Sequence, residues 1–160
     1  MSSSVFIVVP VFNEGTVIAS ALAKLIEKGY SVVCVDDAST DNSLEVIGSL
    51  PVHALRHQIN LGQGASIQTG MTYAIKKSAE YIVHFDADGQ HDAADIPSLL
   101  EPLEKGQADV VLGSRFIRGE DRAAVPPMKR LLLQAGGYVN WGLTGVRLTD
   151  AHNGFRALTA

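Results

Sequence analysis

Two carboxylates separated by a single residue, Asp86 and Asp88, follow directly after an apolar run at residues 81–85. Brought together by a turn at Gly89, their oxygens can hold Mg²⁺ or Mn²⁺ jointly with the phosphates of a substrate. Such an ion neutralises charge on a leaving diphosphate. His91 follows in the same segment, either as a further ligand or as a solvated loop histidine. The segment therefore indicates phosphate chemistry assisted by a divalent metal.

Polar residues also follow the first two apolar runs of the chain, residues 5–11 and 31–35. After the first run, Glu14 either hydrogen-bonds the ribose or base of a ligand or starts a helix with Asn13, where a carboxylate favours the helix dipole. After the second run, burial of the Asp37 carboxylate costs free energy unless a ligand or another group binds it. We predict that Asp37 accepts hydrogen bonds from the N–H groups of a base.

Two further polar positions each have two interpretations. Arg115 follows the apolar run 109–112 and either clamps phosphate oxygens or forms a surface ion pair. The loop 60–64, which ends at Gly64, either brings backbone N–H groups to a phosphate or is a plain loop with a helix cap. We interpret Asp41 as a helix N-cap.

These residues need a frame that brings them to one place, and the apolar pattern indicates which. Short β-branched runs predict strands, and apolar residues at helical spacing predict helices between them. Strands are expected at 5–11, 31–35, 52–55, 81–85 and 109–112, and helices at 13–28, 41–50, 64–78 and 95–105. This alternation predicts an α/β fold with a mostly parallel central sheet and helices on both faces. Ligands of such sheets bind at the carboxyl ends of the strands, where every polar cluster falls.

Composition limits the class of protein. With 160 residues, 46% of them hydrophobic, the chain can build the core of one domain. Its net charge of −4 gives no overall electrostatic attraction to nucleic acid. Cys34 is the single cysteine, so no internal disulfide forms, and we expect a packed core thiol in a reducing compartment. The apolar stretch 131–146 falls short of the ~18 residues of a membrane span. We expect a cytoplasmic protein.

Six segments in this order resemble the family 2 glycosyltransferases, and they cover nearly the whole chain. They are Val9-Pro10-Val11-Phe12-Asn13-Glu14, Asp36-Asp37-Ala38-Ser39-Thr40-Asp41, Asn60-Leu61-Gly62-Gln63-Gly64, Asp86-Ala87-Asp88-Gly89-Gln90-His91, Gly113-Ser114-Arg115 and Asp150-Ala151-His152-Asn153-Gly154-Phe155-Arg156. The last two segments, with the Gln-His after the paired aspartates, look most like the polyprenyl-phosphate sugar transferases related to dolichyl-phosphate mannosyltransferase.

The resemblance implies a GT-A-type fold and a role for each matching residue. The nucleotide-sugar donor and the acceptor would be bound by Pro10, Val11, Asn13, Glu14, Asp37, Gly64, Asp86, Arg115 and Arg156. Asp37 would face the base. Mg²⁺ or Mn²⁺ would be held by Asp86, Asp88 and Gln90. Asp88, Arg115 and Asp150 would be the catalytic residues, with Asp150 and Arg156 on the acceptor side.

The sequence departs from the family pattern at two positions. Ala38 stands where the family usually has Gly, which affects the loop around the base. Gln63 stands where many members carry Lys, which removes one phosphate contact. Neither change affects the metal ligands, and both leave the identity of the donor open.

The function implied is inverting transfer of a sugar from a nucleoside diphosphate to a polyprenyl phosphate. Two alternatives stay open: transfer to a saccharide hydroxyl, for which Asp150 would be the general base, and a non-catalytic nucleotide-sugar-binding fragment. The basic residues of 115–130 suit peripheral contact with an anionic membrane surface, or belong to a solvated loop. We expect one family 2 domain over residues 1–160, shortened on its acceptor side, and an apolar tail that favours a homo-oligomer.

Overall fold

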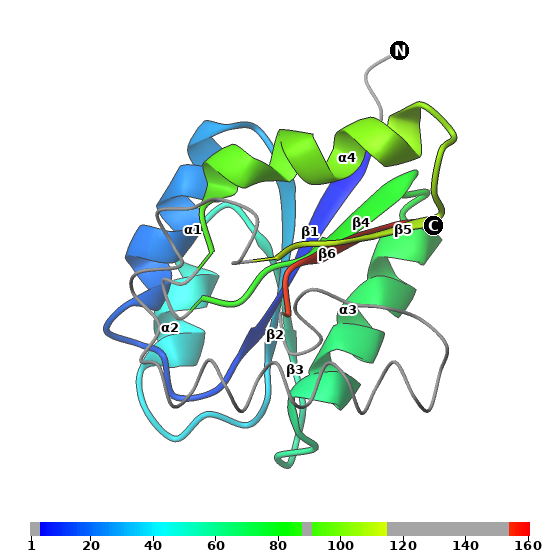
Figure 1. Ribbon diagram of the computed structural model, residues 1–160. Coiled ribbons are helices and arrows are strands. Elements are labelled where there is room, and N and C mark those ends of the chain that lie inside the picture. Colours follow the sequence, from blue (N-terminus) through cyan, green and yellow to red (C-terminus); the bar gives the residue numbers. More distant parts are fainter. Residues whose placement is uncertain (1–3, 88–90, 115–153) are drawn as a thin grey trace, which may run out of the picture. The chain divides into compact units, whose positions relative to one another are not determined.

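The computed structural model describes residues 4–87, 91–114 and 154–160. Within these ranges six strands form one sheet in the order β3-β2-β1-β4-β6-β5 (Figure 1). The strands are β1 (Val5–Val11), β2 (Ser31–Asp36), β3 (His53–Arg56), β4 (Tyr81–His84), β5 (Val110–Leu112) and β6 (Arg156–Thr159). The strands β1 to β4 run parallel to one another, and β6 runs antiparallel to β4. The five strands expected from the sequence are confirmed to within one residue at each end.

Helices cover both faces of the sheet, as predicted. They are α1 (Ile18–Glu27), α2 (Ser43–Gly48), α3 (Gln63–Lys76) and α4 (Ile96–Glu104), the last preceded by the 3₁₀ turn η1 (Ala93–Asp95). Side chains of α1, α2 and α4 pack into one apolar cluster with the sheet, and α3 packs into the other cluster on the opposite face. None of these helices is both long enough and apolar enough to cross a lipid bilayer.

The central strand β1 is buried on both faces, which explains its continuous apolar run. Ile7 and Val9 face the cluster of α1, α2 and α4, whereas Phe6 and Val8 face α3. On the neighbouring strand, Cys34 has no exposed surface, and burial raises the pKa of its thiol to about 12. The thiol is therefore protonated at neutral pH, and the prediction of a packed core cysteine is confirmed.

Two elements differ from the sequence-based expectation. Helix α1 begins at Ile18 rather than at residue 13, because Asn13 has a φ of 56° and the next residues form a turn closed by the Glu14 carbonyl. Strand β6 was not predicted. It has four residues, of which only Thr159 is β-branched, and antiparallel pairing with β4 supplies its hydrogen bonds.

Compact units can also be distinguished along the chain. Residues 1–111 and 155–160 make one unit, which contains the core described above. Residues 112–154 make a second unit, of which 112–114 and Gly154 are described. Every residue that lines the pocket described below belongs to the first unit.

Gly70 allows α3 to approach the sheet. A Cβ atom at this position would lie 2.4 Å from Cγ1 of Val8 and 3.3 Å from Cγ2 of Val35. Both neighbours are β-branched and have restricted χ1 rotamers, so neither side chain turns away freely. The helix therefore sits close to β1 and β2 because residue 70 has no side chain.

We expect Gly70→Ala to lower the free energy of unfolding by about 1 kcal/mol, since overpacking costs ~1–3 kcal/mol and the higher helix propensity of Ala returns part of it. Gly64→Ala is the matched control in the same helix, because a Cβ atom there meets nothing within 4 Å. Urea denaturation followed by circular dichroism measures both. An equal effect of the two substitutions would contradict the close-approach argument.

Candidate functional site

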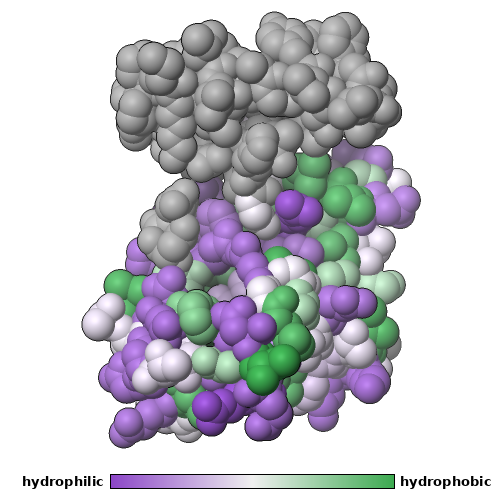
Figure 2. All heavy atoms as spheres, turned by 90° about the horizontal axis from the view of Figure 1, so that it is seen from below, coloured by the Kyte–Doolittle hydropathy of each residue, from purple (hydrophilic) through white to green (hydrophobic). Residues whose placement is uncertain are grey.

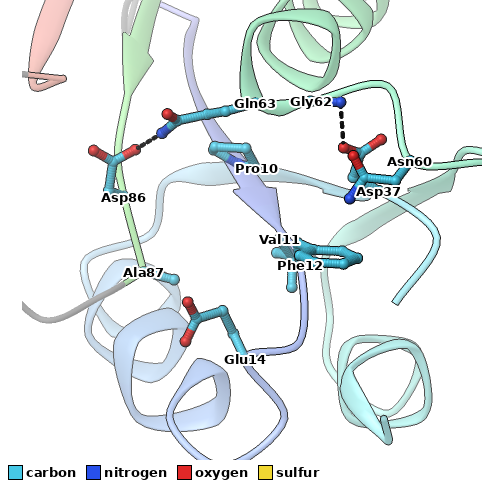
Figure 3. Close-up of a pocket in the computed structure, with 10 residues that line it drawn as sticks. All are labelled: Pro10, Val11, Phe12, Glu14, Asp37, Asn60, Gly62, Gln63, Asp86 and Ala87. Atoms are coloured by element: carbon cyan, nitrogen blue, oxygen red, sulfur yellow. Dashed lines mark hydrogen bonds between the residues drawn. The ribbon is translucent and has the colours of Figure 1, made fainter. Parts of the chain in front are cut away.

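A pocket of about 480 Å³ opens at the carboxyl ends of β1, β2 and β4, beside the N-terminus of α3 (Figure 3). Its volume lies within the usual range for small-molecule sites. It is lined by Pro10, Val11, Phe12, Glu14, Asp37, Asn60, Gly62, Gln63, Asp86 and Ala87. Figure 2 shows the molecule from below the view of Figure 1, where hydrophilic and hydrophobic residues are mixed over the coloured surface. The expectation that the polar clusters meet at this edge of the sheet is confirmed for these residues.

Of the residues predicted to bind substrate, five line the pocket together: Pro10, Val11, Glu14, Asp37 and Asp86. Asn13 and Gly64 do not line it, although their neighbours do. Arg115 lies outside the described residues, as do Asp88, Gln90 and Asp150. Phe12 and Ala87 line the pocket without having been predicted from the sequence, whereas Asn60, Gly62 and Gln63 belong to the loop 60–64, for which phosphate binding and a plain loop were both left open.

Asn13 holds the loop after β1 against the loop after β2. Its N–H donates to Oγ of Ser39 at 2.9 Å, and its side-chain Oδ1 accepts from the N–H of Thr40 at the same distance. One residue further on, the Glu14 N–H donates to Oγ of Ser43 at 2.8 Å. These bonds bring Glu14 to the pocket. They also explain the positive φ of Asn13, whose side chain is hydrogen-bonded to the neighbouring loop.

Asp41 stabilises the same pair of loops. Its carboxylate accepts from the N–H of Ser43, the first residue of α2, at 2.9 Å and from the N–H of Gly15 at 3.0 Å. The hydroxyl of Ser43 and these N–H groups lower the pKa of Asp41. The residue in the N-cap position of α2 is Asn42, one residue after Asp41. The side chain of Asp41 nevertheless accepts a hydrogen bond from the first N–H of the helix, as a capping side chain does.

The carboxylate of Asp37 is buried and accepts three hydrogen bonds. Oδ1 lies 2.7 Å from Nδ1 of His57 and 2.9 Å from the N–H of Leu61. Oδ2 accepts from the N–H of Gly62 at 2.7 Å, the bond drawn in Figure 3. Burial raises the pKa of Asp37, but these donors outweigh it and hold the pKa below its usual value. Asp37 therefore lines the pocket as an anion whose position is fixed by three partners.

The adjacent Asp36 faces the interior and is used differently. Its side chain has no exposed surface, and its nearest cation is Arg56 on β3, with Nε 3.5 Å from Oδ2. Neither carboxylate oxygen has a hydrogen-bond partner among the described residues. The neighbouring carboxylates of the sequence thus divide between a buried ion pair and the pocket.

Asp86 is held on two sides. Nε2 of Gln63 donates to its Oδ1 at 2.8 Å, and its backbone N–H donates to Nδ1 of His91 at 3.0 Å. The ring of His91 stacks on Phe155 with 4.7 Å between centroids, and its side chain is 7% exposed. The interpretation of His91 as a solvated loop histidine is therefore wrong, because the ring is packed and orients the backbone of Asp86.

Gln63 has a role that its departure from the family pattern did not indicate. At the first position of α3, it links this helix to the candidate metal ligand Asp86. A lysine here would bring a positive charge to the same place, whereas the amide brings a neutral donor. The pocket is less positive as a result.

Asp86 is suited to a divalent cation. Its carboxylate is 22% exposed and lines the pocket, and carboxylate oxygens are the ligands that Mg²⁺ and Mn²⁺ prefer. Asp88 and Gln90, the other two predicted ligands, lie outside the described residues. Within the described ranges, no group of three or more His, Cys, Asp or Glu side chains is placed to hold a metal.

Arg156 reaches this edge of the sheet through β6. It is the first residue of the strand and pairs in register with His84, two residues before Asp86. Burial and then the charge of Arg156 lower the pKa of His84 to about 4, so this imidazole is neutral at pH 7. The antiparallel direction of β6 thus brings a cation from the end of the chain beside the strand that carries Asp86.

Comparisons with known proteins agree with this arrangement. The model of the family described as "Glycosyl transferase family 2" matches residues 6–158. The UDP-N-acetylglucosamine--dolichyl-phosphate N-acetylglucosaminyltransferase of Methanococcus voltae is 27% identical and aligns with 97% of this chain and 69% of its own length. The undecaprenyl-phosphate mannosyltransferase of Micrococcus luteus is 29% identical, with 98% of this chain and 66% of its own length aligned. The chain spans about two thirds of the length of these curated relatives.

A solved structure supports the fold. Glucosyl-3-phosphoglycerate synthase from Mycobacterium tuberculosis, crystallised with Mn²⁺ and UDP-glucose, superposes with a TM-score of 0.67 at 19% identity. The match covers 99% of this chain and 56% of the synthase. This likeness confirms the GT-A-type α/β fold predicted from the sequence.

The backbone of the loop after β2 is strained at one residue. Ala38 has a φ of 61°, in the left-handed region, where an L-residue other than Gly costs about 1–2 kcal/mol. We expect Ala38→Gly to raise the free energy of unfolding by about 0.5–1 kcal/mol, after the larger entropy of the unfolded Gly chain is subtracted. Ala108→Gly is the control, because Ala108 does not have a positive φ. Urea denaturation distinguishes them, and equal destabilisation of both would contradict the argument.

Proposed function

The chain belongs to glycosyl transferase family 2, and from this membership we propose that it transfers a sugar from a nucleoside diphosphate to a polyprenyl phosphate, with inversion at the anomeric carbon. Two relatives support the acceptor class, since their names specify dolichyl phosphate and undecaprenyl phosphate. The non-catalytic alternative and transfer to a saccharide hydroxyl are outcomes of the experiments below.

The observation that carries the proposal is the charge of the pocket. Its described lining contains the carboxylates of Glu14, Asp37 and Asp86 and neither a lysine nor an arginine. A diphosphate is itself anionic, so a cation between it and these carboxylates would favour its binding here. The lining therefore suits a ligand that brings a divalent metal with it, as nucleoside-diphosphate sugars do.

The donor would lie between two walls of the pocket. Asp37, held as an anion, would accept a hydrogen bond from an N–H group of the base. Asp86 is on the other wall, at the end of β4, where the diphosphate would lie. Gly62 and Gln63 form the start of α3, and the positive end of a helix dipole favours phosphate.

Mg²⁺ or Mn²⁺ would be held by Asp86 together with Asp88 and Gln90. When bound, such an ion neutralises the charge that develops on the departing nucleoside diphosphate. In this chain Gln63 and His91 keep the carboxylate and the backbone of Asp86 in place for that role. A structure in the same fold was crystallised with Mn²⁺ and UDP-glucose, which supports the assignment.

The transfer itself would be a single displacement. A phosphate oxygen of the acceptor forms a bond to the anomeric carbon as the bond from that carbon to the diphosphate oxygen breaks, and the nucleoside diphosphate leaves. The attacking oxygen is already anionic and needs no strong general base, so catalysis is mainly positioning and electrostatic stabilisation. Arg115 and Arg156 would contact phosphate, and Asp150 would act as a base only toward a hydroxyl acceptor.

We further propose that the protein works at the cytoplasmic face of a membrane. A polyprenyl phosphate is anchored in the bilayer, so its phosphate is reached only at the surface. The basic residues of 115–130, which lie outside the described part of the chain, would contact anionic lipids there. Residues 1–160 would act as part of one family 2 domain.

Nucleotide binding tests the donor site. We expect one of UDP, GDP, CDP and dTDP to bind with an affinity that Mn²⁺ increases. In Asp86→Asn the gain in affinity from Mn²⁺ should be smaller by about tenfold or more, because hydrogen bonds and ion contacts to charged groups exceed ~1.4 kcal/mol. Isothermal titration calorimetry gives both values. Glu101→Gln, a surface carboxylate on α4 that pairs with Lys105, is the control for the loss of one charge. Failure of every diphosphate to bind a folded protein would overturn the donor site.

Labelled transfer tests the acceptor. Protein incubated with a radiolabelled nucleoside-diphosphate sugar, Mn²⁺ and vesicles containing undecaprenyl phosphate should give label that extracts into organic solvent. Vesicles without the polyprenyl phosphate should give none. Label found only in water-soluble saccharide would instead favour the hydroxyl acceptor, and binding without any turnover would favour the non-catalytic alternative.

A further inference from the structure

We infer that His57 is a positioning residue of the donor site, which orients the Asp37 carboxylate and thereby sets which nucleobase is accepted. The inference rests on the proposed function and goes beyond it, because His57 does not line the pocket and belongs to none of the sequence segments that carry the family resemblance. The hydrogen bonds around its ring carry the argument.

His57 is held at three points directly after β3. Its N–H donates to the carbonyl of Asp36 at 2.9 Å, which continues the pairing of β2 with β3. Nδ1 lies 2.7 Å from Oδ1 of Asp37, and Nε2 lies 2.9 Å from Oγ1 of Thr69 on α3. Its side chain is 10% exposed. The ring therefore bridges two strands and the helix whose first residues form a pocket wall.

The partners determine the tautomer of His57. An ionised carboxylate only accepts hydrogen bonds, so Nδ1 carries the proton that is given to Asp37. In the neutral ring Nε2 is then an acceptor for the hydroxyl of Thr69. That hydroxyl makes no other hydrogen bond within the described residues, unlike the hydroxyl of Thr72, which donates to the carbonyl of Gln68. The chain of donors runs from Thr69 through His57 to Asp37.

This chain leaves Asp37 with one free acceptor position. A carboxylate has about four lone-pair sites, two on each oxygen. Oδ1 uses both of its sites for His57 and Leu61, whereas Oδ2 uses one for Gly62. The remaining site on Oδ2 is available to a base in the pocket. Without the imidazole, Oδ1 regains a free site and the carboxylate is less restrained about χ2.

A single fixed acceptor discriminates between bases. Uracil, thymine and guanine carry a ring N–H that donates to it, whereas the corresponding ring nitrogen of cytosine is an acceptor. A carboxylate with two free lone-pair sites and a less restrained orientation accepts a hydrogen bond from the exocyclic amine of cytosine more easily. His57 is therefore expected to affect the ratio of affinities between nucleotides, which a purely structural role would leave unchanged.

The test compares UDP, GDP, dTDP and CDP in the presence of Mn²⁺ by calorimetry. His57→Phe keeps a planar ring but makes no hydrogen bond to Asp37. His57→Asn keeps an N–H donor close to the position of Nδ1. Thr69→Val keeps the shape of its side chain but removes the hydroxyl that fixes the ring. Melting temperatures of all variants report their folding.

We expect His57→Phe to weaken the preferred nucleotide about tenfold or more and to bring its affinity ratio to CDP close to one. His57→Asn should restore most of the ratio, and Thr69→Val should lower it partly. In turnover assays the KM for the donor should rise while kcat changes little, because the ground-state contact with the base is lost.

The outcomes separate this inference from the proposed function. If the wild type binds none of the four nucleotides, the donor site is wrong and the inference fails with it. If the wild type binds and His57→Phe keeps the wild-type ratio, only the role of His57 is overturned. If His57→Phe does not fold, the other two variants decide. A partly lowered affinity ratio in Thr69→Val and a retained ratio in His57→Asn support the role of His57. A wild-type ratio in Thr69→Val together with a lost ratio in His57→Asn overturns it.

Discussion

A carboxylate withdrawn from water is stabilised by a nearby cation or by hydrogen-bond donors, and the fold supplies Asp37 with three donors. One donor is the imidazole of His57 after β3, and two are backbone N–H groups that lead into α3. Since Val11 pairs with Asp36 in the parallel register, the loop after β1 is held beside the same point. This wall of the pocket therefore depends on an ionised Asp37, which its lowered pKa ensures at neutral pH.

Helix α3 connects the two walls. At its start the Gly62 N–H is bound to Asp37, and the Gln63 side chain is bound to Asp86. Two turns later Gly70 lets the helix lie against Val8 and Val35. The separation of the two carboxylates is thus fixed by a rigid element packed on the central strands.

Much of this could be predicted from the sequence, because strands buried on both faces show continuous apolar runs and parallel sheets bring their carboxyl ends to one edge. The pocket therefore contains Glu14, Asp37 and Asp86, as expected. Strand β6 could not be predicted, since its pairing with β4 is formed between residues 72 or more positions apart and its composition favours no strand. His57 gave no signal either, because its importance comes from its tertiary partners Asp37 and Thr69.

The acidic lining also determines how ligands can enter. The three carboxylates of its described lining repel a nucleoside diphosphate and attract a divalent cation. Cation and nucleotide each reduce the repulsion that the other meets, so in the proposed function their binding is mutually favourable, and linkage makes the coupling reciprocal. The amide of Gln63 increases this dependence, because a lysine at the same helix N-terminus would supply part of the missing positive charge. In the proposed function, the residue that removes a direct phosphate contact would thus also increase the dependence of donor binding on the metal.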